Sequence, residues 1–142
     1  MKTVHFILEK KPKAVFSVAK NTSVYEALQL MMDKNISALL IMDGDKLQGV
    51  FTERDYARKI VLQGRTSKDT AIGDVMTKDP VTVTPSESVE KCMKLMTENH
   101  GRQVPVAENG TVIGMISIGD ILKHVSDAAK NTIDHLQSYI QS

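Results

Sequence analysis

The sequence predicts an α+β protein made of two copies of one strand–helix–strand–strand–helix (βαββα) unit, and two observations support this. The first is a repeat: when the chain is shifted by 65 positions against itself, Gly49 falls on Gly114 and Asp55 on Asp120. The apolar positions match in the same register, as a duplicated unit requires. The second is size, because so small a unit leaves an apolar sheet face uncovered. We therefore expect the two units to pack sheet to sheet with pseudo-two-fold symmetry.

The elements of each unit follow from local patterns. Ser23 and Ser88 are typical helix N-cap residues, and apolar residues recur at helical spacing after both. Extended segments and β-hairpin strands are expected at residues 14–18, 38–42 and 47–51 of the first unit, and at 80–84, 103–107 and 112–116 of the second. A final helix is expected to begin near Tyr56 in the first unit and near Ile121 in the second.

These elements predict the domain boundaries. We expect an N-terminal amphipathic segment at residues 1–12, a first repeat at 13–64, a linker at 65–74, a second repeat at 75–128 and a C-terminal helical extension at 129–142.

Composition excludes several classes of protein. The 142 residues are 42% hydrophobic and 25% charged, which is typical of a globular protein, and the formal net charge is only +1. Non-specific binding to nucleic acid or to an anionic membrane is therefore not expected. The chain has no apolar run near the roughly 18 residues of a membrane span. Together with the single cysteine, Cys92, this favours a soluble cytoplasmic protein.

Motifs of catalysis and metal binding are not found in the sequence. It contains neither the GxxxxGK[ST] phosphate loop nor GxGxxG, and its histidines do not show the HExxH spacing of a zinc site. We interpret His100 as a surface residue, although its neighbour Arg102 also suggests a phosphate contact. Cys92 lies on the apolar side of its helix, which indicates a buried thiol. No catalytic residue and no metal ligand is predicted.

The repeated frame carries a hydroxyl and an aspartate three residues apart: Thr52 with Asp55, and Ser117 with Asp120. This spacing is that of a capping box, in which both side chains bind free amides of the first helical turn. The same geometry also suits a ligand, because a carboxylate accepts hydrogen bonds from two ribose hydroxyls and a helix N-terminus attracts phosphate. Both interpretations remain open from the residues alone.

Longer stretches around these frames resemble a tandem pair of CBS domains, the regulatory unit called a Bateman module. They are DVMTKDPVTVTP at residues 74–85 and GRQVPVAENGTVIGMISIGD at residues 101–120. The chain looks like a small stand-alone CBS-pair protein, since little of it lies outside the repeats. The resemblance implies a regulatory module without catalytic activity that binds AMP, ADP, ATP, NAD(H) or S-adenosylmethionine between its repeats.

The resemblance also implies roles for residues of the clefts. Asp55 and Asp120 would bind ribose, with Thr52 and Ser117 beside them. Adenine would lie against the apolar residues that begin each repeat. These are Val15 and Val81.

Phosphate contacts are expected to differ between the clefts. The resemblance places Arg102 with the ligand of Asp55, whereas its counterpart Ser37, with Ala38, would serve Asp120. Arg54 stands where the second repeat has Gly119. We therefore expect the Asp55 cleft to favour phosphate and the Asp120 cleft to be roomier.

The C-terminal residues predict a helix with an apolar stripe, which packs either on the chain's own domain or on a partner. Apolar residues continue at helical spacing as Val125, Ala129, Ile133, Leu136 and Ile140. CBS pairs commonly dimerise through such helices, so a homodimer is expected, either parallel or antiparallel. The N-terminal residues expected to join this interface are Val4, Ile7 and Leu8.

Two functional classes remain. The first is an adenosine-ligand sensor that transmits its state to a regulated protein. The second is a constitutive dimeric interaction module, or a regulatory subunit, with vestigial nucleotide sites.

Overall fold

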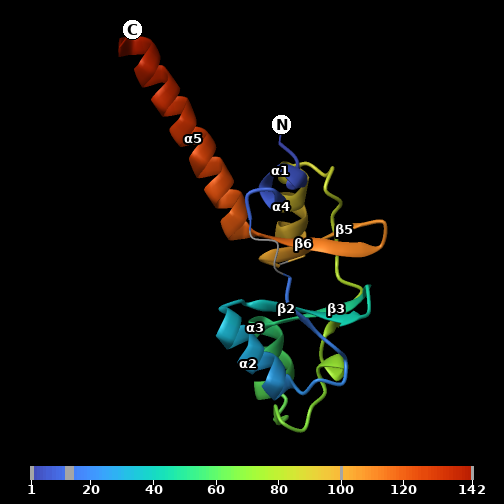
Figure 1. Cartoon of the computed structure of the whole chain (residues 1–142). Coiled ribbons are helices and arrows are strands. Elements are labelled where there is room, and N and C mark those ends of the chain that lie inside the picture. The colour runs from blue at the N-terminus through green and yellow to red at the C-terminus, as the bar shows by residue number, and fades with distance from the viewer. Residues whose placement is uncertain (1, 12–14, 100, 142) are drawn as a thin grey trace.

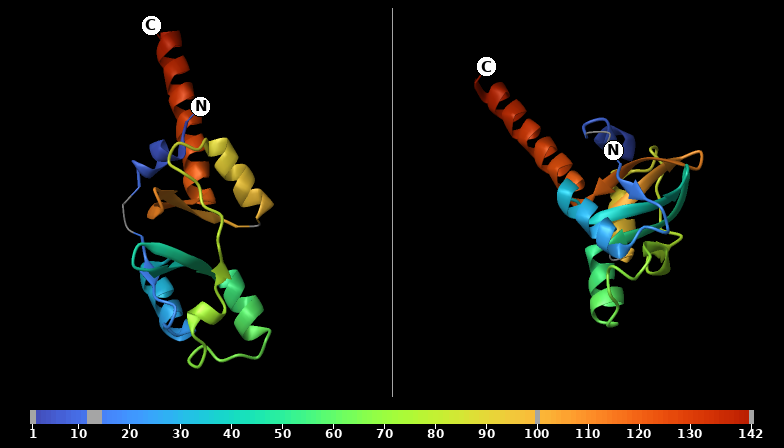
Figure 2. Two further views of the ribbon diagram at one scale, coloured as in Figure 1. Left: turned by 90° about the vertical axis from the view of Figure 1, so that its right-hand side faces the viewer. Right: turned by 60° about the horizontal axis from the view of Figure 1, so that its bottom comes forward.

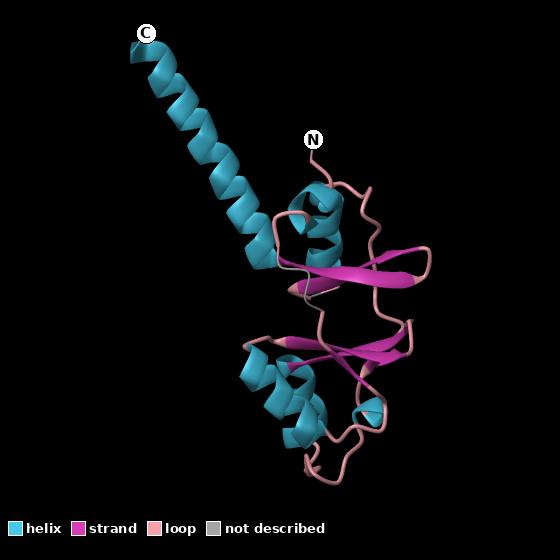
Figure 3. Ribbon diagram, viewed as in Figure 1, coloured by secondary structure: helices cyan, strands magenta, loops and turns pink. Residues whose placement is uncertain are grey.

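Two β-sheets face each other across the middle of the molecule, and helices cover the outer face of each sheet (Figure 1). The structure is a computed structural model that describes residues 2–11, 15–99 and 101–141. Figure 3 shows the resulting order of layers: helices, sheet, sheet, helices. The predicted α+β fold, with two units packed sheet to sheet, is confirmed.

The first half contains the predicted hairpin and its helices. Its elements are β1 (Ser17–Val18), α2 (Val24–Lys34), β2 (Ala38–Asp43), β3 (Lys46–Thr52), α3 (Glu53–Asp55) and the π-helical segment η1 (Tyr56–Val61). The Ser23 hydroxyl caps α2 by accepting a hydrogen bond from the Glu26 amide at 3.1 Å. Strand β1 runs parallel to β2, and β2 pairs antiparallel with β3.

The second half repeats this plan. Its elements are α4 (Val89–Glu98), β5 (Gln103–Glu108), β6 (Thr111–Ser117) and α5 (Ile118–Gln141). Ser88 caps α4 as Ser23 caps α2. Asn109 and Gly110 have φ angles of 53° and 80°, as a two-residue type I′ hairpin turn requires. In place of a counterpart to β1, Val83 alone forms a parallel bridge with Val106.

The final helices begin earlier than expected. They start at Glu53 and Ile118, directly after β3 and β6, instead of near Tyr56 and Ile121. The reason is that Thr52 and Ser117 are themselves the residues that cap these helices. In the first half the expected α-helix is also interrupted, because π-helical segment η1 follows a single turn of α3.

Each half packs against a segment that lies outside it in sequence. The segment before the first half packs on the second half, and the segment before the second half packs on the first. Helix α1 (Val4–Leu8) packs on the second half, and the Val4 amide donates to the Glu87 carbonyl at 2.9 Å. The 3₁₀-helix η2 (Ile72–Asp74) and strand β4 (Thr77–Lys78) instead pack on the first half, where β4 pairs antiparallel with β3. Figure 2 shows the chain after β4 passing from the first half to the second.

The buried residues of these two segments lie in the core of the half on which each segment packs. Val4 and Ile7 are 0% and 4% exposed and lie in the core of the second half. Ile72 and Val75 lie in the core of the first half. The expectation that Val4, Ile7 and Leu8 form part of a dimer interface was therefore wrong for Val4 and Ile7. Burying each such side chain stabilises the chain's own fold, by about 1.5–3 kcal/mol.

Helix α5 extends well beyond the body of the molecule (Figure 1). Only its first turns contact the second half, where Ile121 is buried. Along the rest of the helix large apolar side chains are exposed: Leu122, Val125, Ile133, Leu136 and Ile140. Among the described residues, no helix is both long and apolar enough to cross a membrane.

Candidate functional site

Both hydroxyl–aspartate frames form capping boxes. In the first, the Asp55 amide donates to Thr52 Oγ1 at 3.1 Å, and the Thr52 amide donates to Asp55 Oδ2 at 3.0 Å. In the second, the Asp120 amide donates to Ser117 Oγ at 3.0 Å, and the Ser117 amide donates to Asp120 Oδ2 at 2.8 Å. The structural interpretation of these frames is thus confirmed. The capping boxes fix each carboxylate in the first turn of the helix that follows a hairpin strand.

Each carboxylate is also paired with a lysine. Asp55 Oδ1 lies 3.6 Å from Lys59 Nζ and accepts a hydrogen bond of 3.4 Å from the Thr77 hydroxyl. Asp120 Oδ2 lies 2.7 Å from Nζ of Lys11. The first lysine follows its aspartate by four residues, whereas the second comes from the opposite end of the chain. Neither carboxylate is turned into bulk solvent, since the Asp55 and Asp120 side chains are 14% and 22% exposed.

The surroundings of Asp120 change its acidity. Burial alone would raise the pKa of Asp120. Hydrogen bonds from Lys11 and from Ser117 outweigh this and lower the pKa below its ordinary value. The carboxylate is therefore ionised at neutral pH and is a strong hydrogen-bond acceptor.

A cleft of about 570 Å³ opens beside Ser117, between the two repeats. Ser117 lines it together with Ser37 and Ala38 of the first repeat. Further lining residues are Lys11, Val15, Phe16, Met31, Gln103 and Met115. The lining combines apolar side chains, which suit a flat aromatic base, with polar ones. We name this the Asp120 cleft, since Ser117 and Lys11 both bind that carboxylate.

A second cleft, of about 390 Å³, opens beside Thr52. Arg54 and Arg102 line it together with Val50, so the structure brings the two predicted arginines to one place. We name it the Asp55 cleft, because Thr52 binds that carboxylate. The expected differences in phosphate preference remain predictions.

The two clefts adjoin. Ser37 and Ala38, expected beside Asp120 only, line both clefts, as do Glu53 and Gln103. Where the clefts meet, Gln103 Nε2 donates to Ser37 Oγ at 2.8 Å, which ties one repeat to the other.

Some predicted residues lie apart from the cleft walls. Neither Val81, which is 39% exposed, nor Gly119 lines either cleft. Asp55 and Asp120 do not line the clefts either; each is hydrogen-bonded to a residue that does, Thr52 or Ser117. His100 lies outside the described residues. Cys92 is buried, and burial, followed by the charge of Glu87, raises the pKa of its thiol to about 11.

Sequence reasoning missed Lys11, Gln103 and Met115. Gln103 follows Arg102 directly and occupies the position equivalent to Ala38. This equivalence to a predicted cleft residue was a usable sequence signal for Gln103. Lys11 gave none, because it reaches Asp120 only through the packing of α1 on the second half. Across the described parts of the chain, no three His, Cys, Asp or Glu side chains are grouped as metal ligands.

Comparison with known proteins identifies the architecture. The sequence profile of the CBS domain matches residues 12–62 and again residues 72–127, which together make up most of the chain. The chain belongs to the CBS domain family. Like the solved CBS pairs it resembles, it carries two such domains in tandem.

Individual relatives agree with this assignment. The mitochondrial CBS domain-containing protein CBSX3 of Arabidopsis thaliana is 42% identical over 124 residues, which are 84% of this chain. The match covers 60% of CBSX3, so this chain spans less than two thirds of that relative's length. A solved CBS-domain protein from Burkholderia ambifaria is 50% identical with a TM-score of 0.84, over 87% of this chain and 93% of that one.

One further solved relative contains bound ligands. The CBS domain pair of protein MJ0100 was crystallised with 5′-methylthioadenosine and S-adenosyl-L-methionine. It is 26% identical, with a TM-score of 0.79, over 90% of this chain and 98% of that one.

Proposed function

We propose that this CBS pair is a regulatory module without catalytic activity, which binds an adenosine nucleotide between its repeats and transmits the bound state to a partner protein. The observation that carries the proposal is the placement of Thr52 and Ser117, each in the wall of an inter-repeat cleft and each hydrogen-bonded to a fixed carboxylate. The adenosine ligands of the MJ0100 pair support the same class of ligand.

In this proposal the aspartates bind the ribose. An ionised carboxylate has about four acceptor positions. The capping amide keeps one of them, and a sugar diol competes for the others with Lys11 at Asp120 and with Thr77 and Lys59 at Asp55. Asp55 and Asp120 accept from the 2′- and 3′-hydroxyls. Thr52 and Ser117 lie beside the ribose. Val15 packs against adenine in the Asp120 cleft.

The Asp55 cleft also offers a binding place for phosphate. Arg54 and Arg102 both line it, and guanidinium groups suit phosphate because they donate two parallel hydrogen bonds. AMP, ADP, ATP and NAD(H) are therefore the ligands we favour there. S-adenosylmethionine, which carries a positive charge, is disfavoured beside these two arginines.

We further propose that the chain forms a homodimer through α5. Its exposed apolar residues form one stripe, and an apolar stripe of this length is stabilised by a second surface. A near-neutral net charge disfavours nucleic acid as the partner. The regulated protein is expected in the same compartment, for which we propose the cytoplasm.

A constitutive dimeric interaction module is the second candidate function. It is favoured by one observation: Lys11 and Lys59 already neutralise the two carboxylates without any nucleotide. In that case the clefts are vestigial and only the α5 surface matters.

A thermal-shift panel separates the two candidates. The chain is heated with AMP, ADP, ATP, NAD, NADH or S-adenosylmethionine, and with guanosine monophosphate as the matched control. A ligand present at a hundred times its dissociation constant stabilises the fold by about 2.7 kcal/mol, so a specific ligand raises the melting temperature measurably. If no adenosine ligand does more than the guanosine control, the sensor proposal fails and the interaction module is favoured.

A further inference from the structure

The N-terminal segment places one charged side chain in a cleft formed by residues far away in sequence. Helix α1 is held on the second half by hydrogen bonds from the Val4 and His5 amides to the carbonyls of Glu87 and Pro85, both at 2.9 Å. Three residues after α1, the Lys11 amide donates to the Leu8 carbonyl at 3.2 Å. The backbone of Lys11 is thus fixed relative to the second repeat.

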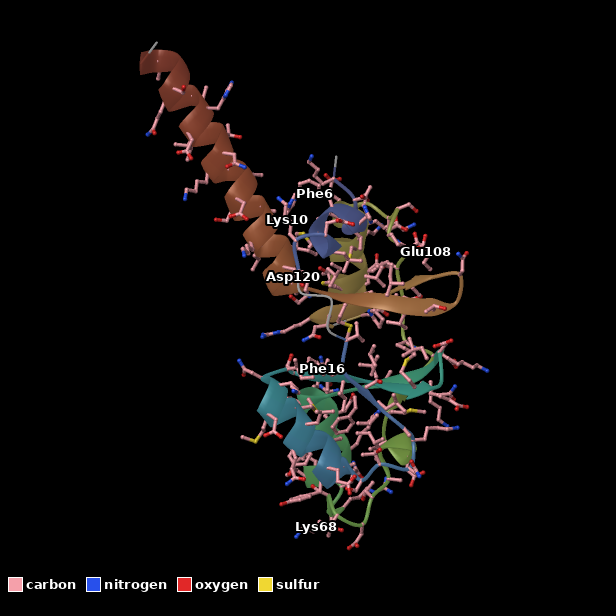
Figure 4. All side chains as sticks on the ribbon, in the orientation of Figure 1. Phe6, Lys10, Phe16, Lys68, Glu108 and Asp120 are labelled. Atoms are coloured by element: carbon pink, nitrogen blue, oxygen red, sulfur yellow. The ribbon has the colours of Figure 1, made fainter. Side chains whose placement is uncertain are left out.

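The ammonium group of Lys11 forms two short hydrogen bonds in the Asp120 cleft. It donates to the Met115 carbonyl at 2.6 Å and to Asp120 Oδ2 at 2.7 Å. Lys11 also lines the cleft, and its side chain is 28% exposed. Figure 4 shows Asp120 at the base of α5, below the N-terminal segment.

We propose that Lys11 is a specificity-determining residue of the Asp120 cleft, which selects adenosine ligands that carry a 5′-phosphate over those with an uncharged or cationic 5′-group. The inference rests on the proposed function, since it assumes that Asp120 binds the ribose. It also adds a basic residue to the Asp120 cleft, whereas basic residues were expected from the sequence in the Asp55 cleft alone.

The argument is one of charge compensation. A ribose diol that binds Asp120 competes with Lys11 for the same carboxylate. An uncharged nucleoside offers the displaced ammonium group no new anion, so a partly buried charge loses its partner, which is unfavourable. A 5′-phosphate supplies that anion, and the flexible stem of a lysine allows its ammonium group to follow. Lys11 therefore weakens the binding of adenosine and strengthens the binding of AMP.

The test compares AMP with adenosine, two ligands that differ only in the phosphate. Calorimetric titration is done on the full chain carrying Asp55→Ala, so that the Asp120 cleft dominates the signal. Into this chain we introduce Lys11→Met, Lys11→Arg or Lys10→Met. Lys10 is the matched control, because its ammonium group lies 4.2 Å from the centroid of the Phe6 ring and it does not line the cleft.

The expected result is a change in preference, not only in affinity. Lys11→Met should weaken AMP binding by about ten- to a hundredfold, the usual effect of losing a charged hydrogen bond. Adenosine binding should become tighter. Lys11→Arg should keep the preference for AMP, since it keeps the charge. Lys10→Met should change neither ligand. Lys11→Gln serves as a second uncharged variant if Lys11→Met unfolds.

Two outcomes would overturn the inference, and they are distinguishable. If Asp120→Ala weakens AMP binding but neither uncharged Lys11 variant changes the ratio of AMP to adenosine affinity, Lys11 does not determine specificity while the proposed function stands. If none of the chains binds either ligand, with native AMP binding also absent, the proposed function fails together with the inference.

Discussion

Gly114 and Leu8 pack so closely that a Cβ atom on Gly114 would lie 2.7 Å from Leu8 Cδ2. The equivalent glycine of the first repeat, Gly49, would bring a Cβ atom to 2.6 Å from Met76 Sδ and 2.7 Å from the Thr77 carbonyl oxygen. Each glycine of the repeated frame thus lies where a segment from outside its repeat crosses a hairpin strand. The glycines are needed for this close approach, which the sequence alone did not reveal.

We predict that Gly49→Ala destabilises the fold more than Gly114→Ala. Gly49 faces a backbone carbonyl that cannot move without breaking the pairing of β4 with β3, so a cost of about 1–3 kcal/mol is expected. Gly114 faces the end of a flexible leucine side chain, which can turn away. Urea unfolding measures both, and Gly101→Ala, where the added Cβ would lie 3.7 Å from the Gln103 carbonyl oxygen, is the matched control. Equal losses for Gly49→Ala and Gly101→Ala would contradict the crossing described here.

Local chemistry in the sequence was enough to predict most elements. The N-cap residues Ser23 and Ser88 and the Asn109–Gly110 turn determine structure within a few residues, and the structure confirms all three. The repeat of 65 residues then predicted the facing sheets. What could not be predicted depends on contacts between distant segments. Nothing near Lys11 or Ile7 in sequence indicates that α1 joins the core of the second repeat.

In the candidate site, too, contacts within a few residues could be predicted from local sequence, whereas contacts between distant segments could not. Pairing of Thr52 with Asp55 and of Ser117 with Asp120 was predictable because each pair lies within one helical turn. The presence of Arg102 in the cleft of Thr52 came from resemblance to the family, not from spacing.

Acid should remove the stabilisation that Asp120 provides. Its pKa in the folded chain is lowered below its ordinary value, about 3.9 in unfolded chains. A lowered folded pKa stabilises the fold above the unfolded pKa, and this stabilisation is lost as the pH falls through the folded pKa. The advantage of the native chain over Asp120→Asn should therefore be constant from pH 7 to about pH 5 and should shrink below about pH 4.

Urea unfolding at several pH values checks this prediction. The exposed Asp127, on α5, is the matched control, and Asp127→Asn should differ from the native chain by little at any pH. A difference between native and Asp120→Asn chains that stays the same from pH 7 to pH 3 would show that the pKa of Asp120 is not lowered by folding.

Dimerisation should depend on the apolar stripe of α5. Ile133 and Leu136 are each 55% exposed, and replacing both with glutamate would place charges in the proposed interface. We expect the double variant Ile133→Glu/Leu136→Glu to sediment as a monomer at micromolar concentration, where the native chain sediments as a dimer. Ser138→Glu, on the opposite side of the helix, should leave the dimer intact. A native chain that is monomeric at this concentration would contradict the proposal.

Nucleotide titration of Asp55→Ala, Asp120→Ala and the double variant tests most directly whether the inter-repeat clefts bind adenosine ligands through their carboxylates. Each single change should weaken its own site by about ten- to a hundredfold, and the double variant should lose specific AMP binding. Asp45→Ala, in the turn between β2 and β3, should bind as the native chain does. If the double variant binds AMP as tightly as the native chain, the carboxylates do not hold the ligand and the central claim is contradicted.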